Sequence, residues 1–196
     1  MTVVETDRIE MADDNAEWSL DQWFELIERM APEGIKAEVV EGAVYMVPQR
    51  DSHWDIIRRI VRAVEDQFGM KVLVKSDVRI DFPGHDNGFC PDVAKLRDGA
   101  KKDERGRWNY EDVEFVTEVI SRGTGLNDYG PKKAAYAEAE VPVYLIADPY
   151  QGRCHVYTHP KNGDYLTVSR SDFGDEVDLT GTVVDLVLKT DEFPRD

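Results

Sequence analysis

Glu118 is an acidic residue within a segment that is otherwise typical of a buried β-strand. In VEFVTEVI (113–120), alternation places Glu118 on the same face as Val116 and Ile120, and the opposite face is also largely apolar. An ionised carboxylate in such a strand must be neutralised, hydrogen-bonded or bound to a cation. Taken alone, Glu118 is explained more simply by a buried salt bridge or a raised pKa than by chemistry.

Asp92 is a second acid on an apolar face, because in FCPDVAKL (89–96) it alternates with Cys90, Ala94 and Leu96. Two buried acids repel each other, and a shared cation explains both. Oxygen ligands without a His or Cys cluster favour Mg²⁺ or Mn²⁺. A metal held by two carboxylates polarises a phosphoryl oxygen and lowers the pKa of bound water, as phosphodiester hydrolysis requires. In the alternative, the two acids form only a buried polar network, whose loss lowers stability without any effect of metal.

Lys132 is the candidate for the cation that stabilises negative charge in a transition state, since it begins the helix expected after the Glu118 strand. Asp128, Lys132 and Tyr136 follow at spacings of four, which would place them on one helical face. Pro131 instead favours a helix start at that position. Asp128 would then lie in the preceding loop, as a cap or a salt-bridge partner of Lys132. We expect Tyr136 to be a packing residue.

A helix and a strand pair are expected upstream. Ser19 and Gln22 form a capping box for an amphipathic helix that Pro32 ends. The valine-rich run 36–47, with Gly42 inside it, predicts two short strands joined by a tight turn.

A second helix is expected from Ser52, capped by Ser52 and Asp55, to Gly69. Its buried stripe should comprise Ile56, Ile57, Ile60, Val61, Val64 and Phe68.

The remaining chain alternates strand-like and polar segments. Strands are expected over 71–82, 89–96, 113–120 and 142–149, a polar loop over 98–112, and short strands with turns at 151–152, 162–163 and 180–181. Helices between strands with apolar runs predict an α/β domain with a mixed sheet.

The chain has 196 residues and a formal net charge of −16. We expect one domain over 18–190, a flexible acidic arm over 1–17 and a tail over 191–196. No apolar stretch is long enough to span a membrane and the start lacks the features of a signal peptide, so we expect a cytoplasmic protein. Cys90 and Cys154 should be buried free thiols, which argues against structural zinc.

The acidic balance argues against a nucleic-acid partner on average, although it does not exclude a local basic strip. Two basic clusters exist: Arg50, Arg58, Arg59 and Arg62 on and before the second helix, and Lys101, Lys102, Arg105 and Arg107 in the polar loop. Trp108, beside the second cluster, could stack on a base. The alternative is a solvated loop, because neighbouring acids dilute its charge. No DNA-reading motif is present, so sequence preference cannot be inferred.

Several of these residues occur in a recognisable order: Pro91-Asp92, Glu118 to Ser121, Thr124, Asp128, Lys132 and Tyr136. This order resembles the pattern PD…EVxS…T…D…K…Y of the Uma-type restriction endonuclease family of bacteria, in the PD-(D/E)XK nuclease superfamily. The resemblance spans residues 20 to 170 and includes Glu38 and His53. It implies a restriction-endonuclease-like α/β fold, with a central mixed β-sheet flanked by α-helices and metal-binding acids at the ends of neighbouring strands.

The resemblance also implies roles for single residues. Asp92 and Glu118 would bind Mg²⁺ or Mn²⁺. The superfamily pattern has a lysine two residues after the second acid, where this chain has Ile120, so Lys132 would supply that ammonium and orient water or stabilise the transition state. Glu38 resembles an additional acid of these nucleases; a surface salt bridge is the alternative. His53 would approach the phosphate; the alternative is a packed residue at a helix start.

The sequence thus predicts a Mg²⁺- or Mn²⁺-dependent endonuclease that hydrolyses phosphodiester bonds of nucleic acid, DNA rather than RNA. A homodimer is expected only by family analogy. The alternative is a non-cleaving interaction module of the same fold, whose acidic surface engages basic partners. Metal-dependent cleavage that Asp92→Ala abolishes would separate the two.

Overall fold

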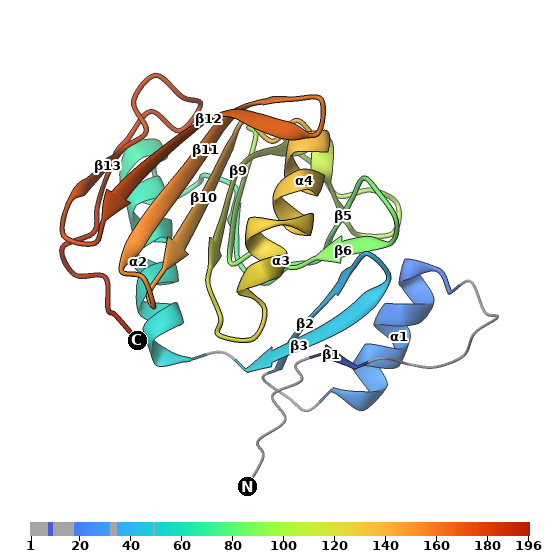
Figure 1. The fold of residues 1–196 in the computed structure, drawn as a ribbon. Helices are drawn as coiled ribbons and strands as arrows, with labels where there is room; N and C mark the ends of the chain where they lie inside the picture. Colours follow the sequence, from blue (N-terminus) through green and yellow to red (C-terminus); the bar gives the residue numbers. More distant parts are fainter. Residues whose placement is uncertain (1–7, 10–17, 32–34, 49) are drawn as a thin grey trace, which may run out of the picture.

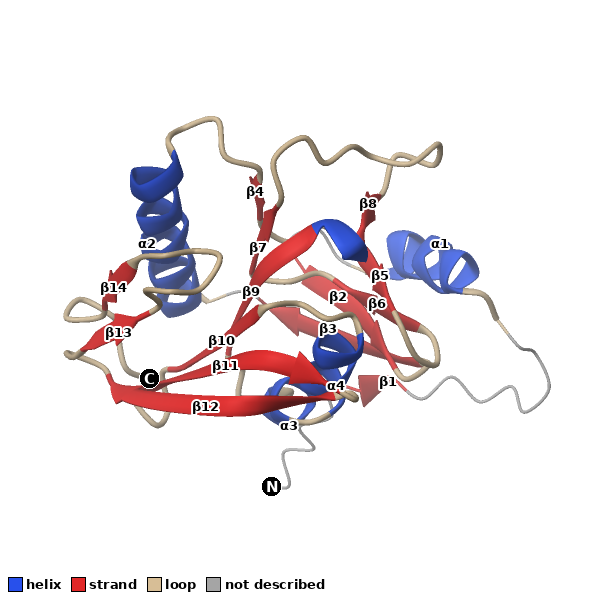
Figure 2. Ribbon diagram, turned by 90° about the horizontal axis from the view of Figure 1, so that it is seen from above, coloured by secondary structure: helices blue, strands red, loops and turns tan. Residues whose placement is uncertain are grey.

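The computed structural model describes residues 8–9, 18–31, 35–48 and 50–196. In these residues the chain forms two six-stranded sheets and a two-stranded one (Figures 1 and 2). The first sheet has the order β1 (Arg8–Ile9), β3 (Ala43–Pro48), β2 (Ile35–Val40), β6 (Asn87–Phe89), β5 (Ile80–Phe82), β8 (Trp108–Asn109). The second has the order β12 (Asp164–Asp172), β11 (Arg153–Lys161), β10 (Val143–Asp148), β9 (Val113–Val119), β7 (Val93–Leu96), β4 (Val74–Lys75).

The second sheet is mixed, as predicted, because β9 pairs parallel with β10 and antiparallel with β7. Both faces of β9 are buried. Phe115 and Val119 pack with the buried residues of helix α2 (Asp51–Phe68), whereas Val116 and Ile120 pack on the other side with helix α4 (Pro131–Glu138). Figure 1 shows α2 on one face of this sheet and α4, with the short helix α3 (Gly125–Tyr129), on the other.

The first sheet is built on the predicted strand pair. Glu41 and Gly42 join β2 to β3 with positive φ angles of 50° and 75°, the backbone of a tight hairpin turn. Helix α1 (Leu20–Met30) covers this hairpin through Ile27, and its predicted capping box between Ser19 and Gln22 is present.

Two expectations for α2 are wrong. The helix begins at Asp51 after Arg50, with no side-chain cap hydrogen bond; Asp55, instead of capping, lies 3.4 Å from the Arg58 guanidinium. Phe68 is 41% exposed, because burial along the helix ends at Val64 and the last turn extends beyond the core.

The predicted strands 71–82 and 89–96 are each divided between the two sheets. The first contains β4 and β5, and the second contains the end of β6 and then β7. Asp92 therefore lies at the crossing between sheets, directly before β7, and not inside a strand. Pro91, which has no N–H to donate, is suited to such a break in a strand. The expected polar loop 98–112 contains β8 and the short 3₁₀ helix η1 (Tyr110–Asp112).

The C-terminal part follows the predicted turns. Asn162 and Gly163 join β11 to β12 with positive φ angles, and β13 (Glu176–Asp178) pairs with β14 (Val187–Lys189). In the expected arm, residues 8–9 pair with β3, and the rest of 1–17 lies outside the described residues. Cys90 and Cys154 are buried free thiols, as expected. Among the described helices, none has the length and apolar character to cross a membrane.

Candidate functional site

Six residues singled out in the sequence come together around one small cavity of about 20 Å³. They come from both six-stranded sheets and three helices, and all six are buried: Glu38 on β2, His53 on α2, Asp92 before β7, Glu118 on β9, Asp128 on α3 and Lys132 on α4. The fold therefore places at one point residues that lie up to 94 positions apart in the chain.

Asp92 is held by the neighbouring strand and by a lysine. Its Oδ2 accepts a hydrogen bond from the backbone N–H of Val119 at 2.7 Å, and its Oδ1 lies 2.8 Å from the Lys36 ammonium. Burial acts to raise the pKa of Asp92, but Lys36 and the Val119 N–H outweigh it and keep that pKa below its usual range. Asp92 is thus a fixed negative charge at the end of β9.

Glu118 faces two different cations with its two oxygens. Its Oε1 lies 2.7 Å from the Lys132 ammonium and accepts a hydrogen bond from the Tyr136 hydroxyl at 2.5 Å. Its Oε2 lies 3.7 Å from the Lys36 ammonium. Burial raises the pKa of Glu118 to about 8 in spite of both lysines. Tyr136 packs among aromatic rings, as expected, and also fixes one oxygen of Glu118.

Lys132 is surrounded by carboxylates. Its ammonium lies 3.0 Å from Glu38, 2.7 Å from Glu118 and 3.1 Å from Asp128. Burial acts to lower the pKa of Lys132, but Asp128 and the other acids raise it above its ordinary value, so the ammonium stays charged. The helix does begin at Pro131, and the expected ion pair with Asp128 is present. Asp128 itself lies in α3 and not in a loop.

Glu38 and His53 are buried parts of this cavity. Glu38 accepts a hydrogen bond from the Cys90 N–H at 2.7 Å and pairs with Lys132, so the alternative of a surface salt bridge is wrong. His53 packs in the first turn of α2, and its Nε2 has no hydrogen-bond partner among the described residues. Burial lowers the pKa of His53, which favours the neutral imidazole.

Lys36 is the central residue that our sequence analysis missed. Its ammonium lies 2.8 Å from Asp92, 3.7 Å from Glu118, 3.8 Å from Glu38 and 3.7 Å from Asp77. The spacing of Lys36 and Glu38, two residues apart on one strand, places both on one face and could have identified it. Asp77 was also missed; it lies at the other sheet crossing with a φ of 54°, and its N–H donates to the carbonyl of Pro91.

The donor set suits a divalent cation. Among the described residues no three acidic, His or Cys side chains form a ready group of metal ligands. The ammonium groups of Lys36 and Lys132 pair with the carboxylates instead. However, one oxygen of Asp92 and one oxygen of Glu118 both face the positive charge of the Lys36 ammonium. Mg²⁺ keeps several waters and needs only one or two protein carboxylates when phosphate supplies further ligands. The donors present for such a cation are thus the oxygens of Asp92 and Glu118 that face Lys36.

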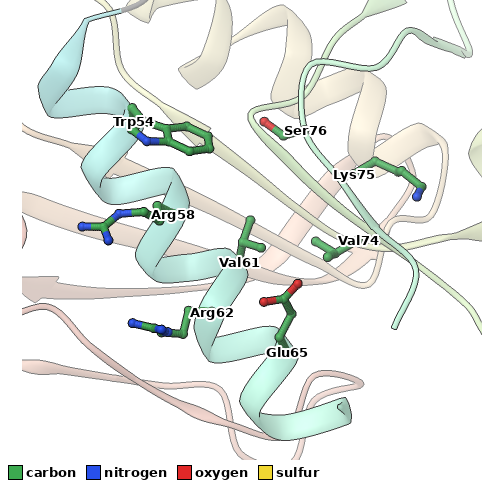
Figure 3. Close-up of a pocket in the computed structure, with 8 residues that line it drawn as sticks. All are labelled: Trp54, Arg58, Val61, Arg62, Glu65, Val74, Lys75 and Ser76. Atoms are coloured by element: carbon green, nitrogen blue, oxygen red, sulfur yellow. The ribbon is translucent and has the colours of Figure 1, made fainter. Parts of the chain in front are cut away.

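The predicted basic residues are distributed over three places, none of them in the cavity. Arg58 and Arg62 line a groove beside Trp54 (Figure 3). Arg59 instead forms an ion pair with Glu192. In the polar loop, Arg105 and Arg107 pair with Asp21 of α1, which uses part of the charge expected for nucleic acid. The ammonium of Lys102 lies 5.7 Å from the centre of the Trp108 ring, and Lys101 is exposed.

Comparison with known proteins agrees with this fold. A solved structure described as a putative nuclease belonging to DUF820, from Anabaena variabilis ATCC 29413, matches with a TM-score of 0.69 and 15% sequence identity, over 90% of this chain and 97% of that chain. At this identity the likeness concerns the fold, and it confirms the predicted α/β nuclease architecture. No curated protein matches. The family model Uma2, described as "Putative restriction endonuclease", matches residues 22–191. Because that match covers most of the sequence, the chain belongs to the Uma2 family of restriction-endonuclease-like proteins.

Proposed function

We propose that this protein hydrolyses phosphodiester bonds of DNA in a reaction that requires Mg²⁺ or Mn²⁺. The observation that carries the proposal is the convergence of Asp92 Oδ1 and Glu118 Oε2 on one positive charge, the Lys36 ammonium. Two carboxylate oxygens directed at one point can serve a divalent cation that also binds substrate phosphate. Membership of a family of restriction-endonuclease-like proteins supports the same reaction class.

Asp92 and Glu118 would hold the metal with the oxygens that now face Lys36. When bound, the metal would polarise a phosphoryl oxygen and lower the pKa of a bound water. The protein prepares both carboxylates for this: the Val119 N–H holds the second oxygen of Asp92, and Tyr136 and Lys132 hold the second oxygen of Glu118. Each acid therefore keeps one oxygen directed at the cation without reorganisation.

Lys132 would supply a permanent positive charge beside the reacting phosphate. Its charge is maintained by Glu38 and Asp128, which we assign as positioning residues because they contact the ammonium. A fixed cation in a buried site stabilises negative charge that develops on phosphoryl oxygens, or orients the attacking water. The Nε2 of neutral His53, which has no hydrogen-bond partner in the described part of the chain, would hydrogen-bond that water or a phosphate oxygen.

Manganese binding, measured by titration calorimetry without DNA, tests the site directly. Asp92→Asn should lower Mn²⁺ affinity by about tenfold or more and abolish cleavage, because an amide is a much poorer ligand than a carboxylate. Asp66→Asn, on the exposed side of α2, is the matched control and should behave as wild type. Circular dichroism would verify that both variants fold.

Unchanged Mn²⁺ affinity in a folded Asp92→Asn variant would overturn the proposed metal site. Metal binding without cleavage of DNA or RNA would overturn the proposed reaction and favour the non-cleaving interaction module.

A further inference from the structure

A groove of about 390 Å³ lies between α2 and the segment that contains β4 (Figure 3). Its floor is apolar and is formed by Val61 of α2 and Val74 of β4. Trp54 lies at one end, and Figure 3 shows its indole extending from α2 toward Ser76. Its volume is within the range of pockets that hold a small organic group.

Trp54 is an exposed aromatic residue on α2. It is 54% exposed, whereas His53 before it and Ile56 in the same turn are buried. An exposed indole face is a platform on which a nucleobase stacks, at about 1–3 kcal/mol per base. A base inside a duplex is already stacked on its neighbours, so the platform suits an unpaired base.

Three of the eight residues that line the groove are basic, in a chain whose net charge is −16. Arg58 and Arg62 follow Trp54 at intervals of four along α2, and Figure 3 shows both guanidinium groups turned outward, away from Val74, at the outer edge of the groove. Lys75 lies on the opposite side, where its ammonium is 5.6 Å from the centre of the Trp108 ring. Glu65 is the one acid among the lining residues. The pair between Arg58 and Asp55 is half exposed on both sides, so it leaves the guanidinium available to phosphate.

Both walls of the groove lead to the acidic cavity. His53, the residue before Trp54, lines that cavity, and Asp77, the residue after Ser76, contacts Lys36. A nucleotide bound in the groove would therefore be close, along the DNA strand, to a phosphate bound at Asp92 and Glu118.

We propose that this groove binds an unpaired DNA nucleotide next to the scissile phosphate. The base stacks on Trp54, and Arg58 and Arg62, at the outer edge of the groove, contact flanking phosphates. This inference rests on the proposed function and adds its substrate class: DNA with a single-stranded or locally opened segment at the cleavage site.

Binding of a fluorescein-labelled thymidine oligonucleotide and of a blunt duplex, measured by anisotropy in EDTA, tests the groove without cleavage. The wild type should bind the single strand more tightly. Trp54→Ala should weaken that binding by about tenfold, within the range for loss of one stacked base, and Trp54→Phe should restore most of it. Arg62→Gln should reduce the slope of log affinity against log salt concentration by about 0.7, the value for one phosphate contact to a single strand.

Two control variants are matched to these substitutions. Phe68→Ala removes another exposed aromatic residue of α2, and Arg59→Gln removes an arginine that pairs with Glu192; both should bind as wild type. Unchanged single-strand affinity in Trp54→Ala would overturn the proposal that the groove binds an unpaired nucleotide. Tighter binding of the blunt duplex by the wild type would also overturn it. If Trp54→Ala loses binding but the wild type does not cleave with Mn²⁺, the groove is supported and only the proposed reaction fails.

Discussion

Glu118 on β9 and Asp148 on β10 lie near the carboxyl ends of two neighbouring parallel strands, and both are buried. Their partners differ in kind. Asp148 accepts hydrogen bonds from the Tyr129 hydroxyl, the Gln151 side chain and the N–H groups of Tyr150 and Gln151, at 2.6–3.0 Å. Glu118 instead faces two ammonium groups. Among the described residues, no lysine or arginine forms a salt bridge with Asp148.

This difference shows that burial of an acid does not by itself indicate chemistry. Asp148 is satisfied by neutral donors that close the turn after β10, which is a structural role. Glu118 lies in a cavity whose charges are paired. Its Oε1 is held by Lys132, and its Oε2 faces a second cation. The kind of partner, more than the depth of burial, therefore separates a candidate catalytic acid from a structural one.

The largest expected effect is on cleavage. Glu118→Gln should lower the rate of metal-dependent DNA cleavage by about 10³-fold or more, because the amide cannot hold the metal. Asp148→Asn, two residues beyond the position of β10 that pairs with Glu118, should retain activity within about tenfold once its folded fraction is taken into account. Similar losses in the two variants would contradict the distinction drawn between them.

The second expected effect is on stability. Here the substitution of Asp148 should have the larger effect and that of Glu118 the smaller one. Asp148→Ala should lower the free energy of unfolding by about 3 kcal/mol, because it leaves several buried donors unpaired. Glu118→Gln should cost less near neutral pH, because the pKa of Glu118 is raised to about 8 and the amide resembles the protonated acid. Urea unfolding with circular dichroism measures both.

The raised pKa of Glu118 predicts a pH dependence of stability. The native pKa of Glu118 is about 8 and its ordinary value is 4.5, so between these pH values the native state binds more protons than the unfolded state. Its contribution to stability therefore falls as pH rises from about 5 to 8. Glu118→Gln should make the unfolding free energy less dependent on pH in this window. An unchanged slope in Glu118→Gln would contradict the raised pKa.

The smallest effect concerns Lys36. Lys36→Met should increase Mn²⁺ affinity about tenfold in calorimetry, because the bound cation no longer has to displace a positive charge between Asp92 and Glu118. Lys133→Met, which removes a lysine that pairs with Asp164 outside the cavity, is the control. Weaker Mn²⁺ binding in Lys36→Met would mean that Lys36 holds the carboxylates in place and does not compete with the metal.

Local patterns predicted those features that depend on neighbouring residues in the chain. The capping box of α1, the turn at Glu41-Gly42 and the burial of both faces of β9 follow from spacing and residue type, and each is present. The start of α2 and the exposure of Phe68 were not predicted, because helix ends depend on where the rest of the core lies.

The candidate site was predicted in part for the same reason. Asp92, Glu118 and Lys132 were singled out because acids on apolar strand faces, and a lysine on the following helix, are recognisable from spacing. Lys36 was not, because a lysine in a valine-rich strand is common on a solvated sheet face. The place of Asp92 was also wrong, since Pro91 is suited to a break in the strand but does not show that 89–96 crosses from one sheet to the other.

The sequence by itself determined the α/β class, the main secondary structure and the identity of the two acids that must be neutralised, because these depend on periodicity and on the cost of burying charge. Only the tertiary structure decided which cation neutralises each acid. The two sheets meet where β2 brings Lys36 and Glu38 against Asp92, Glu118 and Lys132, and a Coulomb interaction depends on distance in space, not on separation along the chain.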